Sequence, residues 1–497
     1  MAVSKILLML PGVTLFGFSS TMVGSEFSIR EATVHDIRIA FEQDILTSRK
    51  LVEFYIGEIE RLNPILRAVI EVNSDALNLA DKADQERKAR EPVSKSWLHG
   101  IPILLKDNIA TKDKLNTTAG SYALLGSIVP RDAGVVAKLR KAGSIILGKA
   151  SLSEWANFRS SNAPNGWSAR GGQAVCPYVK SLDPSGSSTG SAVSVAANMV
   201  AVSVGTETDG SIIFPSNYNS VVGFKPTVGL TSRGGVVPIS PRQDSVGPIC
   251  RTVSDAVYVL DAIVGYDPYD AAATTKASTY IPCDGYVQFL KVDGLKRKRL
   301  GITKDPYFGF PKASKLSELF EQSFQKLRQG GAILVDGLEI PNLAIESMVR
   351  GEQVALEAEF KLSLNAYLKD LVTSPVRSLA DVIAFNYKFS DLLRKQMRLE
   401  NQRKEALRNL TRASKDGFEK LMRKNKLDAW VTPQAVGSSV LAIGGYPVIN
   451  VPAGYDDNGV PCGISFGGLR GSEPKLIEIA YSFEQATKFR KPPSLKP

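Results

Sequence analysis

The sequence predicts an α/β fold, with a mixed sheet that carries helices on both faces. Short apolar runs typical of buried strands alternate with longer segments whose apolar residues recur at helical spacing. No repeat, low-complexity segment or tract rich in Pro, Ser and Gly interrupts the 497 residues. Although that length would ordinarily suggest more than one domain, we therefore expect a single domain over residues 26–497.

The predicted elements alternate regularly along the chain. In segment 48–62, for example, Leu51, Tyr55 and Ile59 recur every four residues, as on one face of a helix. The expected helices cover residues 33–45, 48–62, 74–90, 134–142, 191–198, 253–264, 315–329 and 473–487. The expected strands cover residues 68–72, 102–106, 144–147, 200–205, 299–303, 332–335, 427–433, 446–452 and 460–466. Segment 240–251 is predicted to be a loop.

Residues 1–25 have the layout of a secretory signal peptide. One cation, Lys5, precedes an apolar core at 6–18, small residues follow, and no acidic residue occurs before Glu26. The core is interrupted by a Pro-Gly pair and is short for a membrane span, which leaves a retained anchor as the alternative. We expect cleavage, entry into the secretory pathway and an extracellular protein that has no membrane segment.

Two sequons, at Asn116 and Asn409, would be open to glycosylation in that pathway. Asn409 lies in a basic segment that we expect to be exposed, so it is the better candidate. The four cysteines lie far apart without CxxC spacing, and unpaired thiols and disulfides are equally compatible with a chain of this size. With only two histidines, no metal site and no cofactor are expected.

The net charge of +11 is concentrated in one segment, residues 388–426. This segment has thirteen Lys and Arg against five Asp and Glu, and it reads as a long amphipathic helix with a solvated basic face. Aromatic residues and glycines are scarce among its cations, so binding to nucleic acid is not expected. The sequence carries no signal for an oligomeric state.

The chemistry is expected in the stretch 181–226. Two glycine-flanked turns, 186–190 and 208–211, bracket a run of Ala, Val and Ser. Glycine lets the backbone approach a ligand and turn its N–H groups toward a developing oxyanion, and the serines of these turns are candidate nucleophiles. Long apolar segments flank the turns, which argues against a simple linker.

Composition limits the base that could activate such a serine. The only histidines are His35, in a segment expected to be a surface helix, and His99, expected in a loop. Lys106 follows an apolar strand that would carry its amine into the interior, where burial favours the neutral, proton-accepting form. From this run alone, a surface lysine with a buried stem is equally compatible.

These motifs resemble those of the amidase signature hydrolases, in particular the peptide amidases and their plant relatives. The resemblance extends from about Phe27 to Lys491 and is carried by segments 151–159, 166–173 and 205–212. It implies a single large twisted mixed β-sheet covered by helices on both faces.

The resemblance also implies a Ser–cis-Ser–Lys triad. By motif position the nucleophile is Ser211, the bridging serine is Ser187 and the base is Lys106, and the 24 residues between the serines agree with the family. The peptide bond before Ser187 is expected to be cis, and Thr206 is expected to support the bridge. The expected oxyanion hole consists of backbone N–H groups of Thr208, Asp209, Gly210 and Ser211.

The residues after the nucleophile bear on the substrate. Family members that act on carboxylate-bearing amides tend to place an arginine two or three positions after it, where this chain has Ile213 and Phe214. We therefore expect an uncharged substrate group beside Phe214, with Trp155 and Asn157 as further pocket residues; Trp155 could equally belong to the core.

The predicted activity is hydrolysis of the carboxamide C–N bond of small or peptidic uncharged amides through an acyl-enzyme. A glutamine-dependent amidotransferase subunit is one alternative, which the signal peptide and the missing arginine disfavour. A non-catalytic binding protein on the same scaffold is the other.

Overall fold

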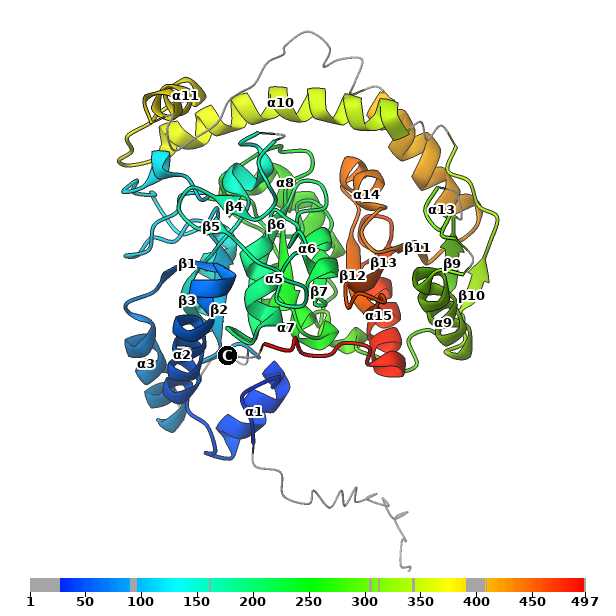
Figure 1. Cartoon of the computed structure of the whole chain (residues 1–497), viewed down its shortest axis with the longest axis horizontal. Coiled ribbons are helices and arrows are strands. Elements are labelled where there is room, and N and C mark those ends of the chain that lie inside the picture. The colour runs from blue at the N-terminus through cyan, green and yellow to red at the C-terminus, as the bar shows by residue number, and fades with distance from the viewer. Residues whose placement is uncertain are drawn as a thin grey trace, which may run out of the picture.

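Strands from both halves of the chain build one eleven-stranded sheet (Figure 1). The computed structural model describes residues 27–89, 96–160, 162–303, 306–311, 313–341, 345–389, 407 and 409–495. The strands of the sheet are β1 (Val69–Val72), β2 (Pro102–Lys106), β3 (Ile145–Ala150), β6 (Val202–Glu207), β7 (Val222–Lys225), β8 (Ser245–Cys250), β9 (Arg299–Ile302), β10 (Ile333–Val335), β11 (Ala429–Pro433), β12 (Val448–Tyr455) and β13 (Pro461–Gly467). Their order across the sheet is β1-β3-β2-β6-β8-β7-β12-β13-β11-β9-β10. The predicted α/β fold is confirmed, whereas the predicted signal peptide lies outside the described residues.

Helices cover both faces of this sheet. α5 and α6 pack on the central strands from one side, and α7 and α15 pack from the other (Figure 1). The helices are α1 (Val34–Glu42), α2 (Ser48–Leu66), α3 (Ala76–Lys88), α4 (Gly134–Lys141), α5 (Thr189–Ala196), α6 (Ile213–Tyr218), α7 (Val253–Ile263), α8 (Ala271–Ala277), α9 (Lys315–Gln329), α10 (Ile345–Asp370), α11 (Leu379–Lys388), α13 (Lys420–Lys424), α14 (Ser438–Gly444) and α15 (Glu473–Thr487). A separate hairpin consists of β4 (Trp167–Ser168) and β5 (Gly172–Gln173).

The sheet is mixed, and its parallel part positions the site. β2 runs parallel to both of its neighbours, β3 and β6, so their carboxyl ends meet at one edge of the sheet. Polar residues at this edge can converge, as they do in other α/β proteins. β8, β7, β12 and β13 are antiparallel to their neighbours, and β11, β9 and β10 form a second parallel group.

Small residues let α5 lie directly on the backbone beneath it, and every residue of this helix is buried. A Cβ atom on Gly190 would lie 2.2 Å from the carbonyl oxygen of Ala68 and 2.4 Å from the nitrogen of Ser151. Backbone atoms cannot move aside as a side chain can, so only glycine fits. The close contact fixes the start of α5, and with it the serine turn that precedes the helix.

The prediction of a loop over residues 240–251 is wrong for its second half. Ser245–Cys250 is strand β8, which lies in the middle of the sheet between β6 and β7. Gly247 and Pro248 obscure this strand in the sequence, because both residues are unusual inside a central strand. The structure explains Gly247, since a Cβ atom there would lie 2.0 Å from the carbonyl oxygen of Phe224.

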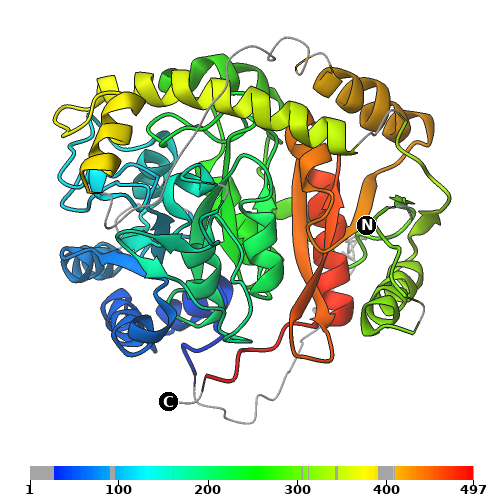
Figure 2. The same ribbon diagram turned by 45° about the horizontal axis from the view of Figure 1, so that its top comes forward.

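The long helix α10 crosses the molecule above the sheet, and Figures 1 and 2 both show it spanning from the side of α11 toward the side of α13. The sequence pattern does not predict this helix, because the apolar residues of Ile345–Asp370 do not form one strong stripe.

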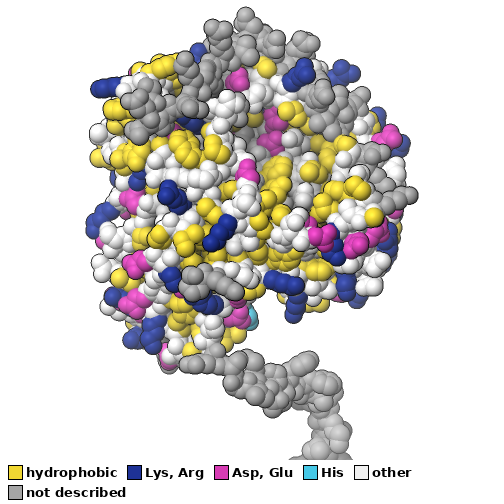
Figure 3. Space-filling view, in the orientation of Figure 1, with side chains coloured by type: hydrophobic (Ala, Val, Ile, Leu, Met, Phe, Trp, Pro, Cys, Tyr) yellow, Lys and Arg dark blue, Asp and Glu magenta, His cyan; other side chains and the backbone are white. Residues whose placement is uncertain are grey.

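Part of the predicted basic helix 388–426 lies outside the described residues. Within the described part, Arg412–Glu419 is helical with π-type hydrogen bonding and continues into α13. On the face drawn in Figure 3, hydrophobic side chains form a broad band across the middle, and Lys and Arg side chains lie singly, mostly near the outline.

All four cysteines are free thiols; Cys283 is exposed and the other three are buried. This settles the alternative that the sequence left open in favour of unpaired thiols. Among the described residues, no helix combines the length and apolarity needed to cross a bilayer.

Candidate active site

Lys106 is the last residue of β2 and is fully buried. Its Nζ atom lies 2.8 Å from Ser187 Oγ, 3.0 Å from the carbonyl oxygen of Thr206 and 2.9 Å from Thr206 Oγ1. A neutral amine has two N–H groups and one lone pair. It can therefore donate to both oxygens of Thr206 and accept the proton of the Ser187 hydroxyl.

The surroundings of Lys106 favour that neutral form. Burial lowers the pKa of Lys106 to about 7, whereas the charges of Glu207 and Asp244 act in the opposite direction. The desolvation of the ammonium form is the dominant effect, as expected for a lysine in the interior. Lys106 can thus accept a proton near neutral pH.

The two serines of the predicted triad are neighbours. The peptide bond between Gly186 and Ser187 is cis, as the resemblance implies. The N–H group of Ser188 donates a 3.1 Å hydrogen bond to the carbonyl oxygen of Ser211, which ties the first serine turn to the second. Ser187 is fully buried, whereas Ser211 is 9% exposed and so lies nearer the surface of the site.

The turn that contains Ser211 presents backbone donors. Among the described residues, no N–H group of residues 208–211 donates a hydrogen bond to the protein. Buried or half-buried donors without partners are rare, so these groups are available to a bound ligand. Gly210 adopts φ +71°, which favours glycine, and the ring of Phe214 lies against it.

Two carboxylates, that of buried Glu207 and that of half-buried Asp244, hold this turn in place. Glu207 Oε2 accepts hydrogen bonds from the N–H groups of Ile212 (2.7 Å) and Ile213 (3.0 Å). Asp244 Oδ1 accepts a 2.6 Å hydrogen bond from Thr208 Oγ1. One carboxylate therefore fixes the residues after the serine, and the other fixes the start of the turn.

The predicted substrate-contacting residues differ in their surroundings. Trp155 is 4% exposed and Asn157 is exposed, with its Nδ2 atom 3.3 Å from Asn165 Oδ1. Phe214 is half-buried against the turn. A cavity of about 10 Å³, the size of one water molecule, lies beside Thr206 and Thr208 and is lined by Ala156 rather than by Trp155 or Asn157.

Four residues of the site are not predicted from the sequence: Asn108, Glu207, Gln243 and Asp244. Asn108 donates a 3.0 Å hydrogen bond to Thr206 Oγ1. Because it lies only two residues after Lys106, the sequence could have indicated that it belongs to the site. Glu207 lies inside the quoted motif and could have been found as a buried acid. Gln243 and Asp244 come from the segment predicted as a loop, and nothing in their local sequence indicates that they reach the serine turn.

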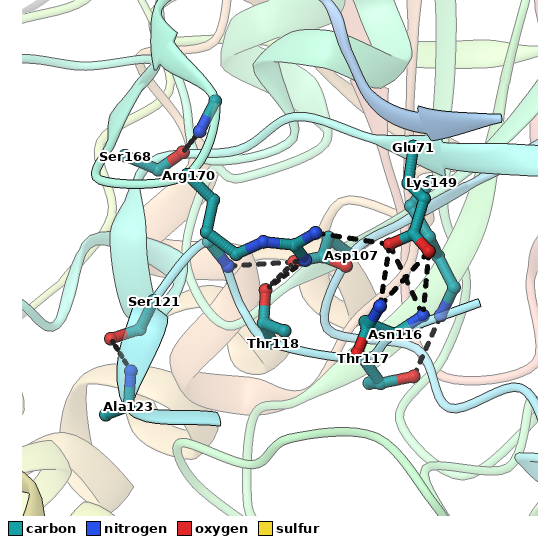
Figure 4. Close-up of polar contacts among 12 residues, drawn as sticks. Glu71, Asp107, Asn116, Thr117, Thr118, Ser121, Ala123, Lys149, Ser168 and Arg170 are labelled. Carbon is teal, nitrogen blue, oxygen red and sulfur yellow. Dashed lines mark hydrogen bonds and ion pairs between the residues drawn. The ribbon is translucent and has the colours of Figure 1, made fainter. Parts of the chain in front are cut away.

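A second buried polar network supports the residue next to Lys106 (Figure 4). The Asp107 carboxylate accepts hydrogen bonds from the Thr118 hydroxyl and, at 2.9 Å, from the N–H of Gly120. Arg170 donates to Thr118 Oγ1 (3.0 Å) and to Glu71 (3.2 Å). These bonds hold the loop that follows β2, and they thereby fix the end of the strand that carries Lys106.

The same network contains a second fully buried lysine, Lys149 on β3. Its Nζ atom donates a 2.9 Å hydrogen bond to Thr117 Oγ1 (Figure 4). It also donates a 2.7 Å hydrogen bond to the carbonyl oxygen of Ile109. Burial lowers the pKa of Lys149 to about 8, and the charge of Asp107 opposes this shift. Lys149 offers a natural comparison for Lys106, because both are buried on adjacent strands but only Lys106 contacts Ser187.

Comparison with known proteins gives a consistent result. A protein-family model described as Amidase matches residues 50–442. The chain is 60% identical to the probable amidase At4g34880 of Arabidopsis thaliana over 490 residues, covering 96% of this chain and 94% of that protein. It is 41% identical to the solved peptide amidase of Stenotrophomonas maltophilia, with a TM-score of 0.85 over 93% of this chain and 98% of the other. A peptide amidase solved with the competitive inhibitor chymostatin is 40% identical, with a TM-score of 0.86 over 94% of this chain and 100% of the other.

Proposed function

Because the chain belongs to the amidase family, we propose that it hydrolyses the terminal carboxamide of small peptide amides through an acyl-enzyme on Ser211. The chain is a serine amidohydrolase that acts on amide C–N bonds, as the sequence predicts. The identity of the substrate and the roles of individual residues belong to the proposal.

In the proposed mechanism, Ser211 Oγ attacks the amide carbonyl while its proton passes to Ser187 and the proton of Ser187 passes to Lys106. The reverse relay protonates the leaving ammonia, and a water molecule then repeats the sequence on the ester. N–H groups of residues 208–211 stabilise the oxyanion, at about 3–4 kcal/mol for each donor. The observation that carries this proposal is the buried Lys106 amine, 2.8 Å from Ser187 Oγ.

The proposed substrate class rests on two observations. The ring of Phe214 lies against Gly210 of the serine turn, and the residues directly after Ser211 supply no cation for a substrate carboxylate. The 41% identical Stenotrophomonas protein is named a peptide amidase. An uncharged carboxamide next to an apolar side chain fits both.

Ammonia release from a substrate panel tests the proposal. The panel contains a dipeptide amide, a fatty acid amide, an aryl acetamide and glutamine, and Ser211→Ala is the inactive control. We expect the dipeptide amide to be hydrolysed fastest and Ser211→Ala to lower its rate by roughly 10⁴-fold or more. Release of ammonia from glutamine alone would instead support the amidotransferase alternative, and full activity of Ser211→Ala would refute the assigned nucleophile.

We further propose that the protein enters the secretory pathway and carries an N-glycan on Asn409. Residues 1–25 motivate the first part, and the exposed position of Asn409 motivates the second. Asn116 is a poorer acceptor, because its Nδ2 atom donates to the Glu71 carboxylate at 3.1 Å. Expression in a secreting eukaryotic cell should give a protein whose mobility changes on deglycosylation. Asn409→Gln should abolish the change and Asn116→Gln should not; retention of the protein inside the cell would contradict the proposal.

A further inference from the structure

Helix α10 is fastened to the loop over residues 239–244 at two positions seven residues apart, and hence on the same face of the helix. Glu359 accepts hydrogen bonds from Ser240 Oγ (2.5 Å) and Arg242 Nε (2.8 Å). Glu352 Oε1 accepts a 2.5 Å hydrogen bond from Gln243 Nε2, which also lies 3.4 Å from the carbonyl oxygen of Thr208. The loop thereby links α10 to the turn that contains Ser211.

Glu352 also lies next to the serine turn. Gln243 Nε2 contacts both the Glu352 carboxylate and the carbonyl oxygen of Thr208, which places Glu352 beside Asp209, and the charge of Asp209 acts to raise the pKa of Glu352. Asp209 Oδ2 accepts a 2.5 Å hydrogen bond from Ser439 Oγ on α14, whereas Asp209 Oδ1 is shielded from water and receives no hydrogen bond from a described donor. Two carboxyl groups in contact can bond only if one of them carries a proton, which would supply the missing donor.

We propose that Glu352 and Asp209 share one proton, and that this proton keeps α10 docked on the serine turn and keeps a second negative charge away from the oxyanion. Glu352 is then a positioning residue for the reaction. The inference rests on the proposed role of the N–H groups of residues 208–211 as oxyanion donors.

The charges around the pair are compatible with a single shared proton. Glu352 is 4% exposed; burial and the Asp209 charge raise its pKa well above the ordinary value, while Gln243 and Arg242 act in the opposite direction. The charge of Asp209 also acts to raise the pKa values of Glu207 on β6 and Lys225 on β7, two groups of opposite charge. At alkaline pH the pair would lose the shared proton, and two carboxylates would repel each other beside the oxyanion.

The test is the pH dependence of kcat/KM for the full chain with the dipeptide amide, from pH 5 to pH 10. In the wild type, kcat/KM should fall about tenfold per pH unit once the shared proton is lost. Glu352→Gln mimics the protonated acid, because its amide can donate to Asp209 and accept from Gln243, so this alkaline fall should disappear while the acid side stays unchanged. Asp370→Asn removes a charge at the exposed far end of α10 and should leave both sides of the profile unaltered.

Infrared spectroscopy separates this inference from the proposed function. At neutral pH the wild type should show one more protonated-carboxyl band than Glu352→Gln, whether or not the dipeptide amide is a substrate. An unchanged alkaline fall in Glu352→Gln, or an unchanged carboxyl band, would overturn the shared proton. An inactive wild type with the expected band difference would instead refute the proposed substrate and leave the shared proton supported.

Discussion

A buried amine can act as a base only while it is neutral, and Lys106 meets this condition through burial. Its hydrogen-bond partners are oxygen atoms of Ser187 and Thr206, so no carboxylate contacts its Nζ atom directly in the described structure. Glu207 and Asp244 act at longer range and weaken the shift without reversing it. Glu207 and Asp244 are therefore close enough to hold the serine turn by hydrogen bonds, but neither contacts the amine of Lys106 in the described structure.

The pH dependence of the reaction follows from this balance. Lys106 has a pKa lowered to about 7, so it is neutral above that pH and protonated below it. We expect kcat/KM to fall about tenfold per pH unit as the pH drops below 7. A rate profile for the dipeptide amide checks this, with circular dichroism at each pH to show that the chain stays folded. A flat profile down to pH 5 would contradict the role of Lys106.

Lys106 and Lys149, two of the three fully buried lysines among the described residues, allow a controlled substitution. Lys106→Met should abolish turnover, since methionine fills the same volume without a proton acceptor, whereas Lys149→Met removes an equally buried amine that does not contact Ser187. We expect Lys149→Met to destabilise the protein by about 1–3 kcal/mol but to leave kcat within severalfold in the folded fraction. Initial rates and urea unfolding of both variants measure the two effects. Equal losses of kcat in both variants would show that burial alone, and not the base, explains the effect at position 106.

At the scale of elements, the close contact beneath α5 leads to a prediction about the free energy of unfolding. Gly190→Ala places a methyl group against the backbone of Ala68 and Ser151, so we expect a loss of about 3 kcal/mol or more in the free energy of unfolding. Gly57 in α2 has no atom within 4 Å of an added Cβ, and Gly57→Ala should instead stabilise by about 0.5–1 kcal/mol. Urea denaturation of the two variants provides the comparison. A Gly190→Ala variant as stable as the wild type would show that α5 can shift.

Elements with a strong pattern could be predicted from the sequence, and those shaped by neighbours could not. Helices such as α2 and α15 and strands such as β2 have a clear period or an unbroken apolar run. β8 carries Gly247 because the backbone of Phe224 packs against it, and α10 lacks one apolar stripe because parts of it contact polar groups such as Gln243 and Arg242.

The residues of the candidate site can likewise be separated into those that the sequence predicts and those that it does not. Lys106, Ser187 and Ser211 lie in motifs that can be recognised locally, and the structure brings their segments together. Asp244, Gln243 and Glu352 reach the serine turn from segments 35 to 143 positions away along the chain, and such contacts follow from tertiary packing rather than from local pattern. Trp155 is 4% exposed, which agrees with the core alternative, and its contact with substrate stays a prediction.

At the scale of the whole molecule, both ends of the described chain meet at the carboxyl-terminal end of α5. The first serine turn, residues 186–190, lies at the other end of this helix. Arg490 in the carboxyl-terminal tail forms an ion pair with Glu31 and lies 3.4 Å from the carbonyl oxygen of Ala196. Asn198, directly after α5, accepts from the N–H of Glu31 at 2.8 Å. Figure 1 shows the tail running back beneath the sheet toward the amino-terminal helices. The tail thus closes the structure around the helix that carries the first serine turn.

Arg490→Ala tests whether this closure stabilises the fold. Arg490 and Glu31 side chains are 14% and 32% exposed, so we expect a loss of about 1–3 kcal/mol in the free energy of unfolding. Burial acts to raise the pKa of Glu31, but the charge and hydrogen bonds of Arg490, together with Arg251 and Asn198, outweigh it and lower the pKa below 4.5. The stabilisation is therefore present above that pH and is lost as the pH falls through the lowered value, so the difference between variant and wild type should shrink in acid.

Lys491→Ala is the matched control for this pair, because Lys491 is exposed and bonds to Tyr178 and Tyr455 only through its backbone in the described structure. Urea unfolding at neutral pH should separate Arg490→Ala from both Lys491→Ala and the wild type. Since the ion pair lies at the far end of α5, kcat/KM of the folded Arg490→Ala protein should stay close to the wild-type value. Equal stability of all three proteins, or a difference for Arg490→Ala that persists unchanged in acid, would show that the ion pair does not hold the tail.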